Sequence, residues 1–469
     1  MAQFKDLILS TPSKAKRRTI RLITTEEFNS AKKAFDEPLH DWLKNIDFTA
    51  DISQVANLPT TFEGADILWG IGDTTEPPAS PWDYSKLAAS LPKGRYDFQN
   101  LDAAHLQAVA AFGWVMAHYN YDTHKSESEQ TLRTLHLPDS PALLRMEAIA
   151  DGCLLARDLV NAPTNHMGPS ELAGEAKALA KTHGAKVKVI KGAQLEKNFP
   201  AIHAVGRAAD DAPCLIDMNW APGGATKSTP KLTLVGKGVC FDTGGLNIKQ
   251  TSGMRNMKKD MGGAANTLGL AHMIMALGLD VRLRVLIPAV ENSISSNAYR
   301  PGDIIATRKG LSVEITNTDA EGRVVLCDAL TLADEDKPDL IIDFATLTGA
   351  ARVALGPDLP ALYANDDDTS RTLMEAGTAA HDPLWHMPLW EGYDTMLDST
   401  VADMLNAADS GFAGSITAAL YLKRFVTETK NWVHLDIFAW NPKSRPGRPI
   451  GGEAMSIRAV FAMLEQRYG

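Results

Sequence analysis

The sequence predicts an α/β protein of two domains, a smaller N-terminal α/β domain and a larger C-terminal domain with a mostly parallel central sheet flanked by helices. Its 469 residues exceed the usual size of a single hydrophobic core. Segments with helical and with strand periodicity alternate along the chain. Several predicted strands are apolar over almost their whole length, which is typical of a sheet covered on both faces.

The first 140 residues alternate short helices and strands. Apolar spacing predicts helices that begin at Thr25 and that cover 101–119, and an apolar run predicts a strand over 65–72. A longer helix is predicted to begin at Pro141 and to end near residue 161, before a loop rich in proline and glycine. We therefore place the domain boundary near residue 165, which gives domains 1–165 and 166–469.

The remainder of the chain repeats a strand–helix alternation. Predicted helices cover 170–184, 264–277 and 417–426. Predicted strands cover 186–190, 213–220, 232–236, 281–290, 311–315, 340–345 and 433–437. Strands that alternate with helices in this way form mostly parallel sheets.

Composition narrows the classes of function. The net charge of −10 argues against a nucleic-acid partner. No segment reaches the roughly 20 apolar residues that span a bilayer, and residues 1–10 lack a signal pattern. The four cysteines are scattered without CxxC spacing, which is typical of reduced thiols in a cytoplasmic protein. We therefore expect a cytoplasmic protein with no membrane partner.

Residues 317–323 (NTDAEGR) place two carboxylates, Asp319 and Glu321, two positions apart and follow them with Arg323. The alternating segment 311–315 predicts a strand before them, and an apolar run predicts a buried helix after them. A turn from strand to helix is where open α/β sheets form ligand crevices. Taken alone, the pattern favours a solvated turn.

A second charged group follows the predicted strand 232–236. Lys237 stands between two glycines with apolar residues on either side, so its amine has little access to water. A buried ammonium is costly, so we expect this amine to be paired, neutral or coordinating. Asp242, Lys249 and Asp260 follow, and the Gly-Gly pair at 244–245 lets the backbone approach a ligand closely.

Common catalytic motifs are absent from this region. The chain has no P-loop, Rossmann glycine pattern, HExxH or GxSxG. Four carboxylates at neighbouring sheet ends would repel one another and have raised pKa values unless cations joined them. Two-metal sites use bridging carboxylates in this way, which favours a dinuclear hydrolase. Solvated turns with salt bridges are the alternative at this point.

Five motifs together resemble the leucyl aminopeptidase family of dizinc exopeptidases, the M17 peptidases. They are residues 235–249 (VGKGVCFDTGGLNIK), 257–264 (MKKDMGGA), 299–303 (YRPGD), 317–323 (NTDAEGR) and 345–350 (ATLTGA). The resemblance extends from about residue 150 to the C-terminus, and 317–323 is the family's hallmark. It implies that the larger domain is catalytic, whereas the N-terminal domain shows no matching motif.

The resemblance implies five metal ligands: Asp242 and Glu321 shared by both ions, Lys237 as a neutral amine and Asp260 at the tighter site, and Asp319 at the more exchangeable site. A metal-bridging water would attack the scissile carbonyl, and Lys249 would stabilise the oxyanion. Arg323 would hold a bicarbonate that shuttles the proton. The ions would be Zn or Mn, with Mg and Co as further candidates.

The same resemblance implies substrate-binding positions at Met257, Thr346, Leu347 and Gly349. Single residues also have simpler interpretations. Met257 and Leu347 fit core packing, Lys249 fits a surface lysine, and Arg323 fits an ion pair with Asp319 or Asp328. The chain departs from familiar members at 250–252 and 440–452, so the first-residue preference stays open.

We therefore expect a metal-dependent aminopeptidase that releases N-terminal amino acids, leucine-like by default, from peptide substrates. The resemblance also implies a homohexamer built as a dimer of trimers. Two other functions are considered: a dipeptide-restricted hydrolase such as a Cys-Gly dipeptidase, and a DNA-binding regulatory role. The acidic balance argues against the second.

Overall fold

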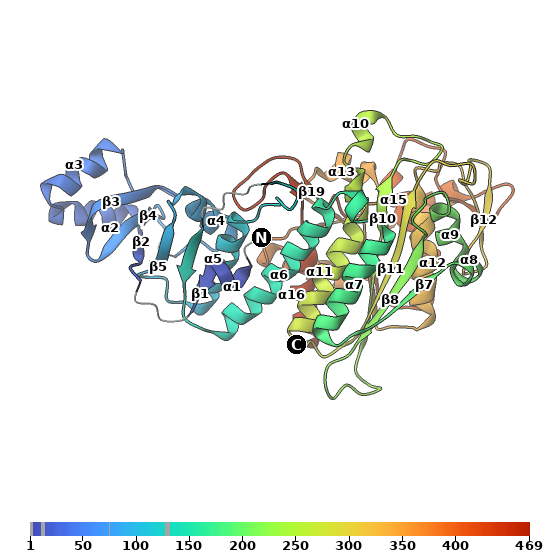
Figure 1. The fold of residues 1–469 in the computed structure, drawn as a ribbon, viewed down its shortest axis with the longest axis horizontal. Helices are drawn as coiled ribbons and strands as arrows, with labels where there is room; N and C mark the ends of the chain where they lie inside the picture. The colour runs from blue at the N-terminus through green and yellow to red at the C-terminus, as the bar shows by residue number, and fades with distance from the viewer. Residues whose placement is uncertain (1–2, 11–14, 75, 127–131) are drawn as a thin grey trace. The chain divides into compact units, whose positions relative to one another are not determined.

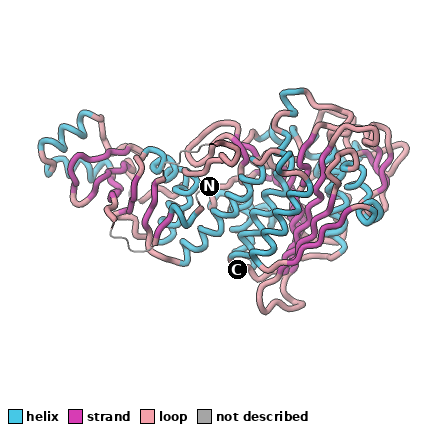
Figure 2. The backbone as a smooth tube through the Cα atoms, in the orientation of Figure 1, coloured by secondary structure: helices cyan, strands magenta, loops and turns pink. Residues whose placement is uncertain are grey.

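The computed structural model describes residues 3–10, 15–74, 76–126 and 132–469 (Figures 1 and 2). The chain forms two compact units, Met1–Asp151 with Lys443–Ile450, and Gly152–Pro442 with Gly451–Gly469. The division falls inside helix α6 (Pro141–Asn161). A domain boundary near residue 165 stays a prediction.

The first unit contains a six-stranded sheet in the order β1-β6-β5-β2-β4-β3. Among its described pairings only β3 with β4 is antiparallel. The strands are β1 (Ile8–Leu9), β2 (Arg18–Ile23), β3 (Val55–Phe62), β4 (Ala65–Gly70), β5 (Gly94–Phe98) and β6 (Arg133–His136). The helices are α1 (Phe4–Leu7), α2 (Thr25–Ala31), η1 (Lys32–Ala34), α3 (Glu37–Asn45), α4 (Pro81–Ser90) and α5 (Ala104–Ala117).

The second unit is organised around a nine-stranded sheet in the order β16-β15-β18-β14-β9-β11-β8-β7, with β10 paired to β11. Five of its eight described pairings are parallel, which confirms the mostly parallel sheet. The strands are β7 (Lys186–Lys191), β8 (Cys214–Trp220), β9 (Lys231–Gly236), β10 (Gly238–Asp242), β11 (Arg282–Asn292), β14 (Leu340–Ala345), β15 (Ala361–Ala364), β16 (Trp385–His386) and β18 (Trp432–Asp436).

Helices cover both faces of this sheet (Figure 1). Helix α11 packs against β9 and β14, and α12 packs against β9 and β11. Every residue of β14 and β18 is buried, as expected for strands between two helical layers. The helices are α7 (Pro169–His183), α8 (Ala193–Asn198), α9 (Pro200–Gly206), α10 (Thr251–Met254), η3 (Met257–Met261), α11 (Gly262–Ala276), α12 (Glu321–Glu335), α13 (Gly349–Leu355), α14 (Asp367–Ala379), η4 (Glu391–Leu397), α15 (Gly414–Lys423) and α16 (Ile457–Tyr468).

One predicted strand does not join the large sheet. β13 (Ser312–Glu314) lies between β12 (Ile304–Ala306) and β17 (Met404–Leu405) in a separate three-stranded sheet. Only the middle residue of β13 is buried, whereas every residue of the central strands β14 and β18 is buried. The acidic turn therefore follows a small side sheet and leads directly into α12. A two-stranded pair, β19 (Trp440–Asn441) and β20 (Gly451–Gly452), completes the fold.

Local chemistry explains several element ends. Ser140 accepts a hydrogen bond from the Leu143 amide at the start of α6, and Gly184 ends α7 with a φ of 69°. All four cysteines are free and buried. Among the described residues, no helix combines the length and apolar character that crossing a membrane requires.

Candidate metal centre and substrate cleft

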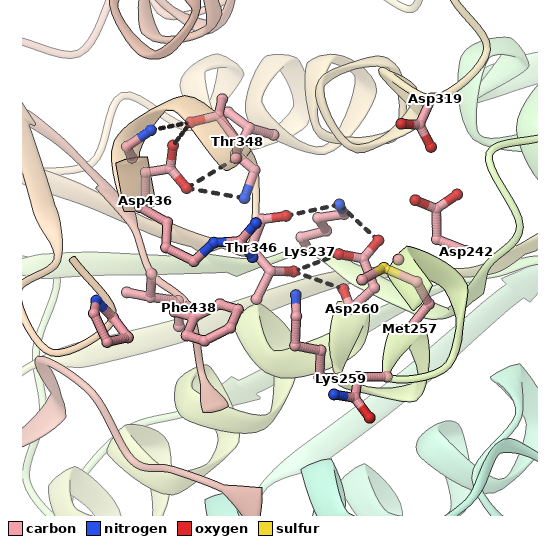
Figure 3. A pocket seen from close by; sticks show the side chains of 18 of the residues that line it. Lys237, Asp242, Met257, Lys259, Asp260, Asp319, Thr346, Thr348, Asp436 and Phe438 are labelled. Carbon is pink, nitrogen blue, oxygen red and sulfur yellow. Dashed lines mark hydrogen bonds and ion pairs between the residues drawn. The ribbon is translucent and has the colours of Figure 1, made fainter. Parts of the chain in front are cut away.

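Charged side chains from distant segments gather around one cavity of about 520 Å³ (Figure 3). Lys237 follows β9, Asp242 ends β10, and Asp260 lies in η3. Asp319 lies in the turn before α12, and Glu321 is the first residue of that helix. The carboxyl ends of parallel strands meet at one sheet edge, which is why segments far apart in sequence supply one site. All five predicted metal ligands line the cavity.

The amine of Lys237 lies at the centre of this arrangement. It is 2.7 Å from Asp260 Oδ2 and 2.8 Å from Glu321 Oε1, and it donates to the Thr346 carbonyl oxygen at 3.0 Å. Burial opposes the charge, but these two carboxylates hold the pKa of Lys237 above its usual value. The buried lysine is therefore paired, one of the three states that its sequence context predicts.

Two glycines leave room for these groups. A Cβ on Gly322 would lie 2.7 Å from Lys237 Nζ, so the residue after Glu321 must lack a side chain. Gly244 has a φ of 87°, and its Cβ would lie 2.9 Å from Asp319 Oδ1. The glycines in both motifs are thus required by the close approach of backbone and charged side chains.

The carboxylates are crowded enough to hold cations. Single oxygens of Asp242, Asp319 and Glu321 lie within 4.8 Å of one another. Lys249 joins this group, with Nζ 2.7 Å from Asp242 Oδ2 and in contact with Asp319. Burial, followed by the charge of Asp242, raises the pKa of Glu321 well above its usual value. Its buried Oε2 has no hydrogen-bond partner among the described residues, so the oxygen-rich donor set fits divalent cations.

Arg323 lies outside the cavity lining but is buried two residues beyond Glu321. Its Nη1 donates to the Asn406 carbonyl oxygen at 2.9 Å, and its buried Nε has no partner among the described residues. Burial lowers the pKa of Arg323. In the described part of the chain it forms no ion pair with Asp319 or Asp328, the two partners that sequence allowed. A buried guanidinium with a free donor fits a small anion such as bicarbonate.

The four predicted substrate positions also line the cavity: Met257, Thr346, Leu347 and Gly349. Thr346 donates to Asp260 Oδ1 at 2.8 Å, which ties this wall to the carboxylates. Leu347 is half-buried and also packs against the hydrophobic core, so both of its sequence interpretations hold.

Sequence reasoning missed several residues around the site. Asn292 donates to Asp242 Oδ1 at 2.8 Å and to the Thr318 carbonyl oxygen at 3.0 Å. Asp436 accepts from the backbone amides of Leu347 and Thr348 at 3.0 and 3.1 Å and thereby fixes the loop between β14 and α13. Asn292 and Asp436 each end a largely apolar strand, a signal that was available in the sequence. The lining residues Lys259 and Phe438 carried no such signal.

Comparison with known proteins gives matches over both parts of the chain. The model of the cytosol aminopeptidase family, catalytic domain, matches residues 154–461. The model of the M17 aminopeptidase N-terminal domain matches residues 19–138. The second match corrects the sequence interpretation, which found no resemblance there.

Individual relatives agree. A probable cytosol aminopeptidase of Rhizobium rhizogenes is 45% identical over 343 residues, covering 70% of this chain and 68% of the relative. One from Rhizobium johnstonii is 39% identical over 453 residues, covering 93% and 84%. The crystal structure of cytosol aminopeptidase from Coxiella burnetii has a TM-score of 0.91 and 45% identity, covering 98% of this chain and 99% of that one. The bottromycin maturation enzyme BotP in complex with Mn has a TM-score of 0.86 and 30% identity, covering 97% and 100%.

The fold and the carboxylate-rich cavity define a metal-dependent exopeptidase. The chain belongs to the cytosol aminopeptidase family, the M17 peptidases, and is an aminopeptidase of that family. These matches do not favour the Cys-Gly dipeptidase or the DNA-binding alternative.

Proposed function

We propose that this cavity is the active site and that it holds two divalent cations. Asp242 and Glu321 would be shared by both ions, Lys237 and Asp260 would complete one site, and Asp319 the other. The observation that carries the proposal is the buried Glu321 Oε2, which has no hydrogen-bond partner among the described residues and lies in a cavity that the three other proposed carboxylate ligands also line. Removing so much negative charge from water is costly unless cations compensate it.

When bound, the cations would supply Lewis-acid polarisation of the scissile carbonyl and would lower the pKa of a nucleophilic water. Without a cation, the charges of Asp260 and Glu321 raise the pKa of Lys237 and favour its charged form. A cation at those carboxylates would reverse this electrostatic balance and favour the neutral amine that can act as a ligand. Zn and Mn are the proposed ions, with Mg and Co as further candidates. The Mn complex of the relative BotP supports Mn.

Two further cationic groups would act on the substrate. Asp242 and Asp319 hold the Lys249 ammonium at the cavity wall, where it would donate to the developing oxyanion. The Arg323 guanidinium would hold a bicarbonate as the proton carrier, because none of the residues lining the cavity is a histidine that could serve as base. The unpartnered Arg323 Nε supports this assignment.

The proposed reaction releases N-terminal amino acids from peptides, with leucine-like residues as the default substrate. We also propose a cytoplasmic location, supported by the four free, buried cysteines. A homohexamer is proposed as well. Large apolar side chains exposed on the second unit support burial in an assembly: Val353, Trp385, Trp390, Val401 and Phe412.

The test is hydrolysis of leucine p-nitroanilide with added Mn²⁺ or Zn²⁺. We expect turnover that 1,10-phenanthroline abolishes and that added metal restores. Absence of turnover on a panel of aminoacyl anilides and dipeptides, with metal bound, would overturn the proposed function.

A further inference from the structure

A third lysine of the cavity, Lys259, has no anionic partner in the part of the chain that the structure describes. It directly precedes Asp260 in η3, and its side chain lines the cavity although the residue is only 6% exposed. Among the described residues, no carboxylate or hydrogen-bond acceptor pairs with its amine. Figure 3 shows this amine between the Phe438 ring and Asp260. Lys237 and Lys249, by contrast, each contact two carboxylates.

The groups around this amine form a cationic wall, which we define as Lys259, Arg352 and Phe438. Lys259 Nζ lies 5.1 Å from the centroid of the Phe438 ring, and the Arg352 guanidinium carbon lies 4.7 Å from it. All three side chains line the cavity. An aromatic face compensates an ammonium only weakly compared with a carboxylate. The cationic wall therefore presents two cationic side chains to the cavity, and both contact the Phe438 ring.

A buried, unpaired ammonium is costly, and the cavity offers space in which an anion could join it. Lys259 lines the same cavity as the proposed metal ligands and directly precedes one of them, Asp260. In the proposed function the α-amine of a substrate binds at those ligands, so we take the side chain of the first residue as the group that extends to Lys259. Arg352 lines the same cavity but is exposed, so its charge is better solvated than that of Lys259.

We propose that the cationic wall binds a substrate carboxylate, and that its source is the side chain of an N-terminal glutamate or aspartate. Lys259 would be the specificity-determining residue and Arg352 an auxiliary cation. This inference rests on the proposed aminopeptidase function and replaces its leucine default with a preference for acidic first residues.

The test compares the aminomethylcoumarin amides of Glu, Gln and Leu, because Glu and Gln share a shape and differ in charge. The wild-type enzyme is expected to show a higher kcat/KM for Glu than for Gln. Lys259→Met keeps the length and apolar stem, and it is expected to lower kcat/KM for Glu by about 10- to 100-fold. The values for Gln and Leu should change by less than about 3-fold. Arg352→Met should give a smaller loss, confined to Glu.

Lys258→Met is the matched control. Lys258 is the neighbouring lysine, but it donates to the Asn161 carbonyl oxygen and does not line the cavity. Its replacement should leave the Glu-to-Gln ratio unchanged. Equal losses on all three substrates in Lys259→Met would assign Lys259 to the support of Asp260 and overturn the proposal. An unchanged Glu-to-Gln ratio would overturn it as well.

Two further measurements separate the possible sources and failures. Leu-Gly and Leu-Gly amide differ only in the C-terminal carboxylate. A Lys259→Met loss confined to Leu-Gly would place the bound carboxylate at the peptide's C-terminus and overturn the side-chain source. Calorimetric binding of free glutamate and glutamine needs no turnover. If no substrate is cleaved, the proposed aminopeptidase function is wrong. Binding of glutamate that is tighter than binding of glutamine, and that Lys259→Met removes, would still support the cationic wall.

Discussion

The two halves of helix α12 bury carboxylates in opposite ways. In the second half, Asp334 accepts backbone N–H bonds from Thr427 at 2.8 Å and Thr429 at 2.7 Å, and Asp328 accepts backbone N–H bonds at 2.7–3.3 Å. In the first turn, Glu321 keeps a buried oxygen without a partner, and Arg323 keeps a buried N–H without one.

This difference separates structural from functional burial. Backbone donors satisfy Asp328 and Asp334 within the folded chain, so these residues need nothing from outside. Glu321 and Arg323 are also buried, but each has a polar atom without a partner among the described residues, which a cation and an anion would bind. In α12, burial of a charged side chain therefore does not by itself indicate a ligand site. A buried charged side chain that lacks a hydrogen-bond partner for one of its polar atoms does indicate one.

The largest expected effect is the loss of activity when Glu321, in the first turn of α12, is replaced. Glu321→Gln removes a proposed shared ligand, and several kcal/mol of lost metal stabilisation correspond to a fall in kcat of about 10³-fold or more. Metal analysis should show fewer than two ions per chain. The control is Glu335→Gln at the exposed end of the same helix, which should keep both ions. Full metal occupancy in Glu321→Gln would contradict its assignment as a ligand.

Arg323→Met should lower kcat by about 10²-fold, the size of a general acid–base contribution. The rate of the wild-type enzyme should rise with added bicarbonate, and the variant should lose this response. The exposed Arg371→Met, from an ion pair on α14, serves as the control. A bicarbonate response that persists in Arg323→Met would place the anion elsewhere.

The second half of α12 should respond in stability instead. Asp334→Ala leaves backbone N–H groups of the 427–429 segment without their acceptor, which should lower the free energy of unfolding by about 2–4 kcal/mol. Urea unfolding measures this loss. Activity per folded, metal-loaded molecule should stay within about 2-fold of the wild type. A selective loss of kcat with unchanged stability would remove the distinction between the two halves.

The smallest effect concerns pH. Burial raises the pKa of Asp328 to about 7, against about 4 in an unfolded chain. Between these values the folded protein holds a proton that the unfolded chain releases, so this contribution to stability falls as pH rises from about 4 to about 7. Metal-free wild type should lose about 1 kcal/mol or more relative to Asp328→Asn between pH 5 and pH 8. An equal difference in unfolding free energy between the wild type and Asp328→Asn at pH 5 and at pH 8 would contradict the raised pKa.

Much of the fold could be predicted from sequence, because periodicity and capping are local. The bounds of α6 and the end of α7 at Gly184 follow from such signals, whereas the helix predicted over 101–119 is α5, Ala104–Ala117. β13 shows the limit, since a short alternating strand does not reveal which sheet it joins. Its partners lie up to 91 residues away, in a segment that the alternation does not specify.

The candidate site divides in the same way. The five proposed ligands could be predicted because each lies in a compact motif of charged residues and glycines. Asp436 and Asn292 each end an apolar strand, which marks them as candidates, but their roles could not be predicted because their partners lie 89 and 50 residues away in the chain. Lys259 lies inside a recognised motif, yet nothing local distinguishes it from the neighbouring Lys258.

The residue types and their spacing thus determined the chemistry by themselves: carboxylates for cations, a buried lysine among glycines, an arginine beyond them. Only the tertiary structure decided which of these charged groups are satisfied. Lys237 contacts two carboxylates, and Lys259 contacts none within the described ranges. The physical reason is that the partner of a buried charge is supplied by whatever segment folds against it, and long-range packing makes that choice.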